Sequence, residues 1–93
     1  MSISKVKVSE SHERLMLAIG ETIRIHTQQS PMPLEGIVGV LAFCSGAAIS
    51  RGSKGRQMRR AMREMAVANI DFGIEAVASS MANTSLILPE GMQ

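Results

Sequence analysis

The sequence predicts an all-α fold, a small bundle of three main helices within a single domain of 93 residues. Two long segments repeat apolar residues at spacings of three and four, which is the period of an amphipathic helix. A third segment, between them, is rich in Ala and Gly and has almost no polar face. The chain has two Phe and neither Trp nor Tyr, so aliphatic side chains and eight Met must fill a core. Such side chains suit closely packed helices better than a β-sandwich.

The composition is that of a folded, soluble domain. Hydrophobic residues make up 45% of the chain and charged residues 19%, so it can bury a core. A single cysteine excludes an internal disulfide. The first ten residues contain no apolar stretch of signal-peptide length, and the longest apolar run, residues 37–49, is shorter than the ~20 residues of a membrane span. We therefore expect a cytoplasmic protein without a membrane partner.

Residues 1–8 alternate weakly between apolar and charged side chains, as Lys5, Val6 and Lys7 illustrate. The pattern fits either a short strand or a loose N-terminal arm, and we favour the arm. It is followed by a first helix over 9–29, where Ser9 or Ser11 can act as the N-cap. The apolar face of this helix comprises His12, Met16, Ile19, Ile23 and His26.

A second helix is predicted over 33–50, after a break at Pro31. Pro33 is preset for a first helical turn, and Glu35 is favourably placed near the positive end of the helix dipole. Because the segment has no polar face, we expect it to be buried on nearly all sides as the central helix of the bundle. A buried strand is the alternative, but the run is long for a strand and rich in Ala and Gly.

A third helix is predicted over 54–83, with Gly52 ending the second helix and Ser53 capping the third. Its residues form two apolar stripes, displaced from each other around the helix by roughly 140° at ~100° per residue. The helix is interpreted as continuous, with a possible break near Gly73. The remaining residues, 84–93, form an apolar tail that packs on the core or on a partner.

The length of the third helix favours a homodimer. A single three-helix bundle would leave part of its two-sided apolar surface in water, and large exposed apolar patches commonly mark interaction sites. A two-fold dimer is the simplest assembly. Asn69 could fix the register of paired helices, although it more simply contacts solvent or a backbone group. The expected oligomer interface comprises Met58, Met62, Met65, Asn69, Phe72, Ile74, Val77 and Met81.

Positive charge is concentrated around the start of the third helix. Six of the ten basic residues lie in 51–63, which we call the basic segment, although the formal net charge of the chain is only +2. The simpler interpretation is a solvated face that keeps the protein soluble. The alternative is a site for phosphate, nucleic acid or an acidic protein, since like charges at a helix N-terminus are unfavourable without a ligand. The residues of this hypothetical site are Arg51, Ser53, Lys54, Arg56, Arg59, Arg60 and Arg63.

No catalytic, metal or cofactor signature is present in the sequence. The "GSKG" stretch lacks the spacing of a nucleotide-binding loop. Cys44 lies in the most apolar segment and is interpreted as a small buried hydrophobic residue. His12 and His26 are four turns apart, too far to share one metal ion on a straight helix. The sequence therefore predicts a non-enzymatic, homo-oligomeric interaction or structural protein, with a nucleic-acid- or phosphate-binding regulatory protein as the alternative.

Overall fold

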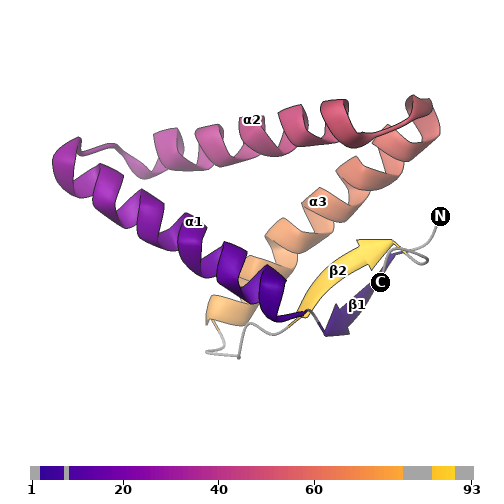
Figure 1. The fold of residues 1–93 in the computed structure, drawn as a ribbon, viewed down its shortest axis with the longest axis horizontal. Coiled ribbons are helices and arrows are strands. Elements are labelled where there is room, and N and C mark those ends of the chain that lie inside the picture. The colour runs from indigo at the N-terminus through magenta and orange to yellow at the C-terminus, as the bar shows by residue number, and fades with distance from the viewer. Residues whose placement is uncertain (1–2, 8, 79–84, 90–93) are drawn as a thin grey trace.

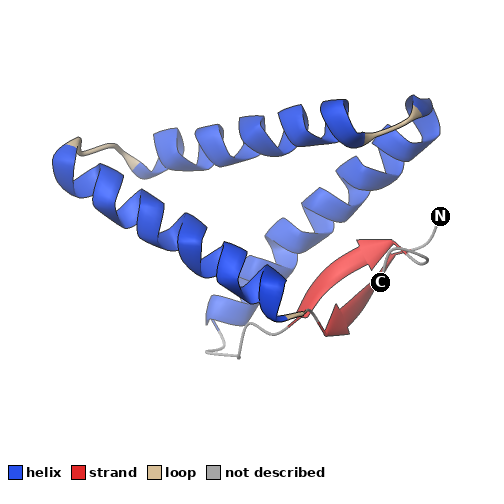
Figure 2. Cartoon of the chain, in the orientation of Figure 1, coloured by secondary structure: helices blue, strands red, loops and turns tan. Residues whose placement is uncertain are grey.

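The computed structural model describes residues 3–7, 9–78 and 85–89, and three helices dominate it. They are α1 (Glu10–Gln29), α2 (Leu34–Gly52) and α3 (Gly55–Ala78), of 20, 19 and 24 residues. Two short strands, β1 (Ile3–Lys7) and β2 (Ser85–Pro89), flank the helices in the chain (Figures 1 and 2). The three-helix, predominantly α fold is thus confirmed, with a two-stranded ribbon added to it.

The ribbon corrects the expectation of a loose N-terminal arm. β1 and β2 pair antiparallel, with Ile3 opposite Pro89 and Lys7 opposite Ser85. The backbone groups of β1 therefore find hydrogen-bonding partners in the tail. β2 in turn packs against α3, as expected for an apolar tail that returns to its own chain (Figure 1).

Two short turns connect the helices close to the predicted positions. Ser30 ends α1, its N–H donating to the carbonyl oxygen of His26 (2.8 Å), and Pro33 stands directly before α2. Between α2 and α3, Ser53 closes α2 by donating its N–H to Ile49 (2.9 Å) rather than capping α3. The glycine with a left-handed backbone is Gly55, with φ of 85°, and not Gly52. Gly55 therefore supplies the reversal that allows α3 to begin.

α3 is one continuous helix through Gly73, so the possible break does not occur. Residues 79–83 of the predicted third helix lie outside the described residues. At the other end, α1 starts one residue after Ser9, whose carbonyl oxygen accepts the N–H of His12 (3.1 Å) and of Glu13 (3.3 Å). The Ser9 hydroxyl makes no capping bond and instead lies 2.7 Å from Nδ1 of His12.

The helices form the three sides of an open triangle (Figure 1). α2 meets α3 near their shared turn, whereas α1 has no comparably extensive contact with either helix in the described part of the chain. The radius of gyration is 14.2 Å, against about 12.3 Å for a compact domain of this length. The molecule measures 41 × 28 × 22 Å along its principal axes. The chain is therefore expanded for its size.

The expectation of a buried central helix is wrong for the single chain. Among the residues whose burial is described, only Ala61 and Ala76, both on α3, are buried. α2 contributes none, and Leu34 and Phe43 are 74% and 79% exposed. The sequence pattern correctly predicts a helix here, but the open arrangement supplies no neighbouring helix to cover it.

Candidate interaction surfaces

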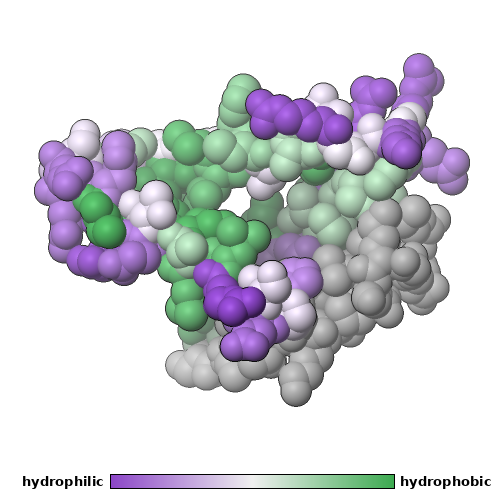
Figure 3. All heavy atoms as spheres, in the orientation of Figure 1, coloured by the Kyte–Doolittle hydropathy of each residue, from purple (hydrophilic) through white to green (hydrophobic). Residues whose placement is uncertain are grey.

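α2 is the most apolar of the three helices. Only Gly36, Ile37, Ala47 and Ile49 are even half-buried, and every other residue of the helix is exposed. Figure 3 shows hydrophobic side chains along α2, with hydrophilic ones gathered at the corner where α2 meets α3. Cys44 is exposed rather than buried, because it lies on this uncovered helix. A large apolar surface of this kind is unusual for a soluble monomer.

Two apolar grooves run beside α2. One, of about 380 Å³, lies between α1 and α2, and His26 is among its lining residues. The other, of about 910 Å³, lies between α2 and α3. Its α2 wall is made of small and aliphatic side chains, whereas Arg59, Arg63 and Asn69 lie among the apolar residues of its α3 wall. The second groove therefore combines an apolar lining with two positive charges.

The two apolar stripes of α3 differ in exposure. The inner stripe, which comprises five of the predicted interface residues, is half-buried and runs beside the two buried alanines: Met58, Met62, Met65, Asn69 and Phe72. The outer stripe is exposed: Val67, Ile70, Ile74 and Val77. Of the predicted interface residues, Ile74 and Val77 therefore lie on open surface, and Met81 lies outside the described residues.

Asn69 bonds to the backbone of its own helix. Its Nδ2 donates a hydrogen bond to the carbonyl oxygen of Met65, at 3.1 Å. Of the two roles considered for Asn69, this is the simpler one, a contact with a backbone group. The bond satisfies the side-chain amide of Asn69 on a partly buried face of α3. Its assignment to the oligomer interface stays a prediction.

The basic segment is exposed and carries no compensating acid. All six of its basic side chains are exposed, and Ser53 is half-buried. Across residues 3–7, 9–78 and 85–89, the one ion pair is that of Glu21 with Arg24 on α1, so none involves the basic segment. At the start of α3, the Lys54 N–H donates to Sδ of Met58 (3.4 Å). This weak bond satisfies one of the free N–H groups of the helix terminus.

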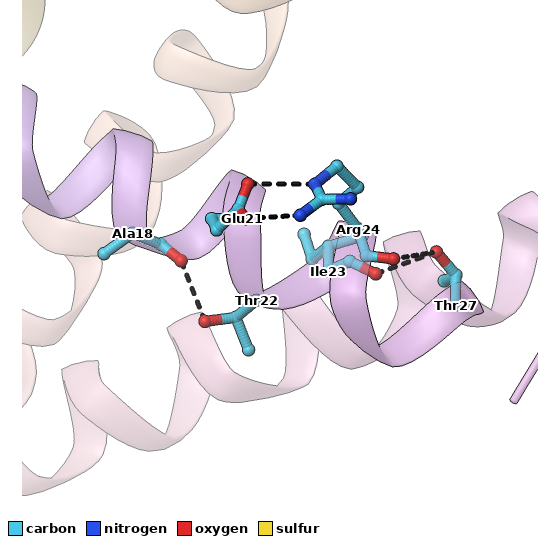
Figure 4. A network of polar contacts seen from close by, with 6 residues as sticks. All are labelled: Ala18, Glu21, Thr22, Ile23, Arg24 and Thr27. Atoms are coloured by element: carbon cyan, nitrogen blue, oxygen red, sulfur yellow. Dashed lines mark hydrogen bonds and ion pairs between the residues drawn. The ribbon is translucent and has the colours of Figure 1, made fainter. Parts of the chain in front are cut away.

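Polar contacts on α1 are local. Arg24 donates to Glu21 through both Nε (3.0 Å) and Nη2, and Thr22 and Thr27 donate their hydroxyls to carbonyl oxygens one turn back (Figure 4). The Arg24 guanidinium holds the pKa of the Glu21 carboxyl below its usual value. The same bond raises the pKa of Arg24. These bonds stabilise the helix surface and do not link α1 to another element.

Both histidines of the chain lie on α1. Within the described part of the chain, no group of three His, Cys, Asp or Glu side chains is placed to hold a metal ion. His12 and His26, predicted on a packing face, are both exposed because α1 stands apart from the other helices.

α2 is long and apolar enough to cross a membrane by length and composition. The expectation that the apolar run is too short for a membrane span therefore does not hold for the whole helix. However, Glu35 and Arg51 lie near its ends, and the uncharged residues between them, 36–50, span about 22 Å at 1.5 Å per residue. That length falls short of the ~30 Å hydrocarbon core of a bilayer.

Sequence reasoning missed the exposure of α2, and with it Leu34, Val38 and Phe43 as candidate contact residues. One signal was present in the sequence. A helix that is apolar on all sides needs several apolar neighbours to cover it. The apolar stripes of the other two helices are too limited to cover α2 on every side. Comparison with known proteins adds no further assignment, because no family model, curated protein or solved structure matches the chain.

Proposed function

We propose that this chain is a small, non-enzymatic helical protein that works as a homo-oligomer, most simply a two-fold dimer. In the dimer, a second copy covers α2 and adjoining apolar surface. The observation that carries the proposal is the area of the single chain. Its accessible surface is 7120 Å², against about 5,200 Å² for a folded monomer of 10.0 kDa. The excess, about 1,900 Å², lies within the range of about 1,000–2,500 Å² per protomer that obligate dimers bury.

The energetics of folding support the same proposal. Ordering each residue costs about 1–2 kcal/mol of conformational entropy, and burial of apolar surface is the main compensating term. A chain with only two buried residues among those described lacks most of that term. Association would provide it, because the exposed face of α2 would then become core.

Sedimentation equilibrium tests the proposal directly. We expect a dimer of about twice the 10.0 kDa chain mass at micromolar concentration. Replacing Phe43 by Ser should shift the equilibrium toward monomer, because it removes an exposed ring from α2. The matched control is Leu17→Ser, which removes a comparably exposed apolar side chain from α1. A monomer of wild-type chain at these concentrations would refute the proposal.

The exposed arginines support a second candidate, a regulatory protein that binds phosphate groups of nucleic acid through the basic segment. The supporting observation is that six basic side chains on one turn and helix face lack an acidic partner among the described residues. Such a surface suits anionic backbones, and its affinity should fall steeply with salt. The segment contains no aromatic side chain for base stacking, so sequence preference should be weak.

A gel-shift titration with duplex DNA at two salt concentrations tests this candidate. The triple variant Arg59→Ala, Arg60→Ala, Arg63→Ala should bind more weakly and lower the salt slope by about 0.9 for each phosphate that the variant no longer neutralises. A second triple variant, Lys5→Ala, Lys7→Ala, Arg14→Ala, removes the same charge elsewhere and should bind normally. Equal affinity of the two triple variants would exclude the basic segment as the contact.

A further inference from the structure

The charges of α2 are confined to its ends and have opposite signs. Glu35 lies in its first turn and Arg51 in its last, and residues 36–50 carry no charge. Beyond Arg51 the chain enters the rest of the basic segment, so the corner shared by α2 and α3 is strongly positive. At the opposite corner, where the C-terminus of α1 and the N-terminus of α2 carry opposing partial charges, Glu35 supplies the formal negative charge of α2. The molecule is therefore electrically polar along α2.

This polarity bears on how two copies can share an α2 interface. Parallel pairing would place the two basic segments side by side, with six positive charges on each. Antiparallel pairing instead brings the basic segment of each copy to the Glu35 corner of the other. Complementary charge fixes orientation and register even where it adds little affinity.

Resting on the proposed homo-oligomer, we propose that α2 pairs antiparallel with α2 of a second copy, about a two-fold axis near Phe43. Phe43 is midway between Glu35 and Arg51, and at 79% exposure it is among the most exposed hydrophobic side chains described. A two-fold interface uses the same patch twice, so both ends of the pair gain the same favourable charge arrangement. The apolar residues between the ends would form the shared core.

Cysteine cross-linking measures the direction of pairing. Cys44 is free and exposed, so a Cys44→Ser background allows single cysteines to be placed at Gly36 or Ser50, which lie two turns before and after Phe43 on the same face of α2. In the antiparallel pair, two copies of position 36 are about 21 Å apart along the helix axis, and so are two copies of position 50, whereas position 36 of one copy lies opposite position 50 of the other. In a parallel pair, equivalent positions are neighbours on helices about 8–10 Å apart.

A short bismaleimide therefore gives distinct outcomes. Antiparallel pairing predicts cross-links when Gly36→Cys and Ser50→Cys chains are mixed, and none within either variant alone. Cross-links within each variant alone would overturn the antiparallel arrangement. If sedimentation shows a dimer but the mixed sample forms no cross-links, the antiparallel arrangement is also overturned, whereas the proposed homo-oligomer is not. A monomer, or a chain recovered only with phosphatidylcholine vesicles, would overturn both.

Charge exchange supplies an independent test by sedimentation. Glu35→Lys should raise the dimer dissociation constant about tenfold, since it places like charges together at both ends of the pair. Glu35→Gln, which removes only the attraction, should have a smaller effect. Adding Arg51→Glu to Glu35→Lys should restore part of the dimerisation, since it returns one pair of opposite charges to each end while the other five basic residues of the segment remain. Failure of that rescue, with both chains retaining wild-type helical content, would contradict the antiparallel pairing.

Discussion

At the scale of single residues, Gly55 decides where α3 can begin. Its φ of 85° is a backbone conformation that L-residues with a side chain rarely adopt. This left-handed conformation reverses the chain after α2, which a residue with a Cβ atom would do only at a cost.

Replacing Gly55 by Ala should destabilise the protein by about 1–2 kcal/mol, the cost of a left-handed conformation for a residue with a Cβ atom. Urea unfolding of the protein at a fixed concentration measures the change. Gly52→Ala is the control, because Gly52 is helical and has open space around it. The control should be neutral or slightly stabilising. Equal destabilisation by both substitutions would contradict this role of Gly55.

The Glu21–Arg24 pair makes a prediction about pH. The folded-state pKa of Glu21 is lowered, so the contribution of the pair to stability is present above the unfolded pKa of the carboxyl and disappears as the pH falls through the folded value. Arg24→Ala should raise the Glu21 pKa toward its ordinary value. Carbon-detected NMR titration of the Glu21 carboxyl in the wild-type and variant chains checks this shift. An unchanged Glu21 pKa in the variant would contradict the pairing.

At the scale of elements, the sequence predicts where the helices lie along the chain but not which other elements they contact. The breaks at Pro31 and after Gly52, together with the repeats of three and four, locate α1, α2 and α3 to within a few residues at their described ends. These signals act between neighbours in the chain. The pairing of Ile3 with Pro89 joins opposite ends of the sequence, and a weakly alternating segment gives no indication of so distant a partner.

The candidate surfaces were predictable to a similar degree. The period of α3 correctly separated its two apolar stripes, and the arginines of the basic segment lie exposed without acidic partners among the described residues. The same pattern could not show that Met58 and Phe72 are half-buried while Val77 is exposed. For α2, an apolar sequence predicts burial but does not specify whether the cover belongs to the same chain.

The continuity of α3 through Gly73 leads to a prediction for this helix. Gly73 is exposed, helical and has nothing within 4 Å of the position where a Cβ atom would lie. Gly73→Ala should therefore stabilise the protein by up to about 1 kcal/mol, since Ala loses less backbone entropy in a helix. Thermal unfolding followed by circular dichroism measures it. A loss of stability would indicate that the helix requires flexibility or close contact at this residue.

At the scale of the whole molecule, the open triangle means that folding and association should be coupled. If a second copy supplies the cover for α2, the folded state is stabilised by mass action. The melting temperature should then rise as the protein concentration is raised over about two decades, from 5 to 500 μM, because dimerisation stabilises the folded state. Differential scanning calorimetry at the two concentrations checks this. A melting temperature independent of concentration would show that the single chain is stable without a partner.

The β1–β2 ribbon brings the first and last described elements of the chain side by side. Since Ile3 and Pro89 are adjacent across the ribbon, a short peptide could join these two strand ends without displacing any helix. A circularly permuted chain opened between Ser53 and Lys54 would retain every helix and the ribbon, with new termini at the positive corner. The stability of this permuted chain, compared with that of the wild type, would separate the contribution of the joined ribbon from the contribution of the α2–α3 turn.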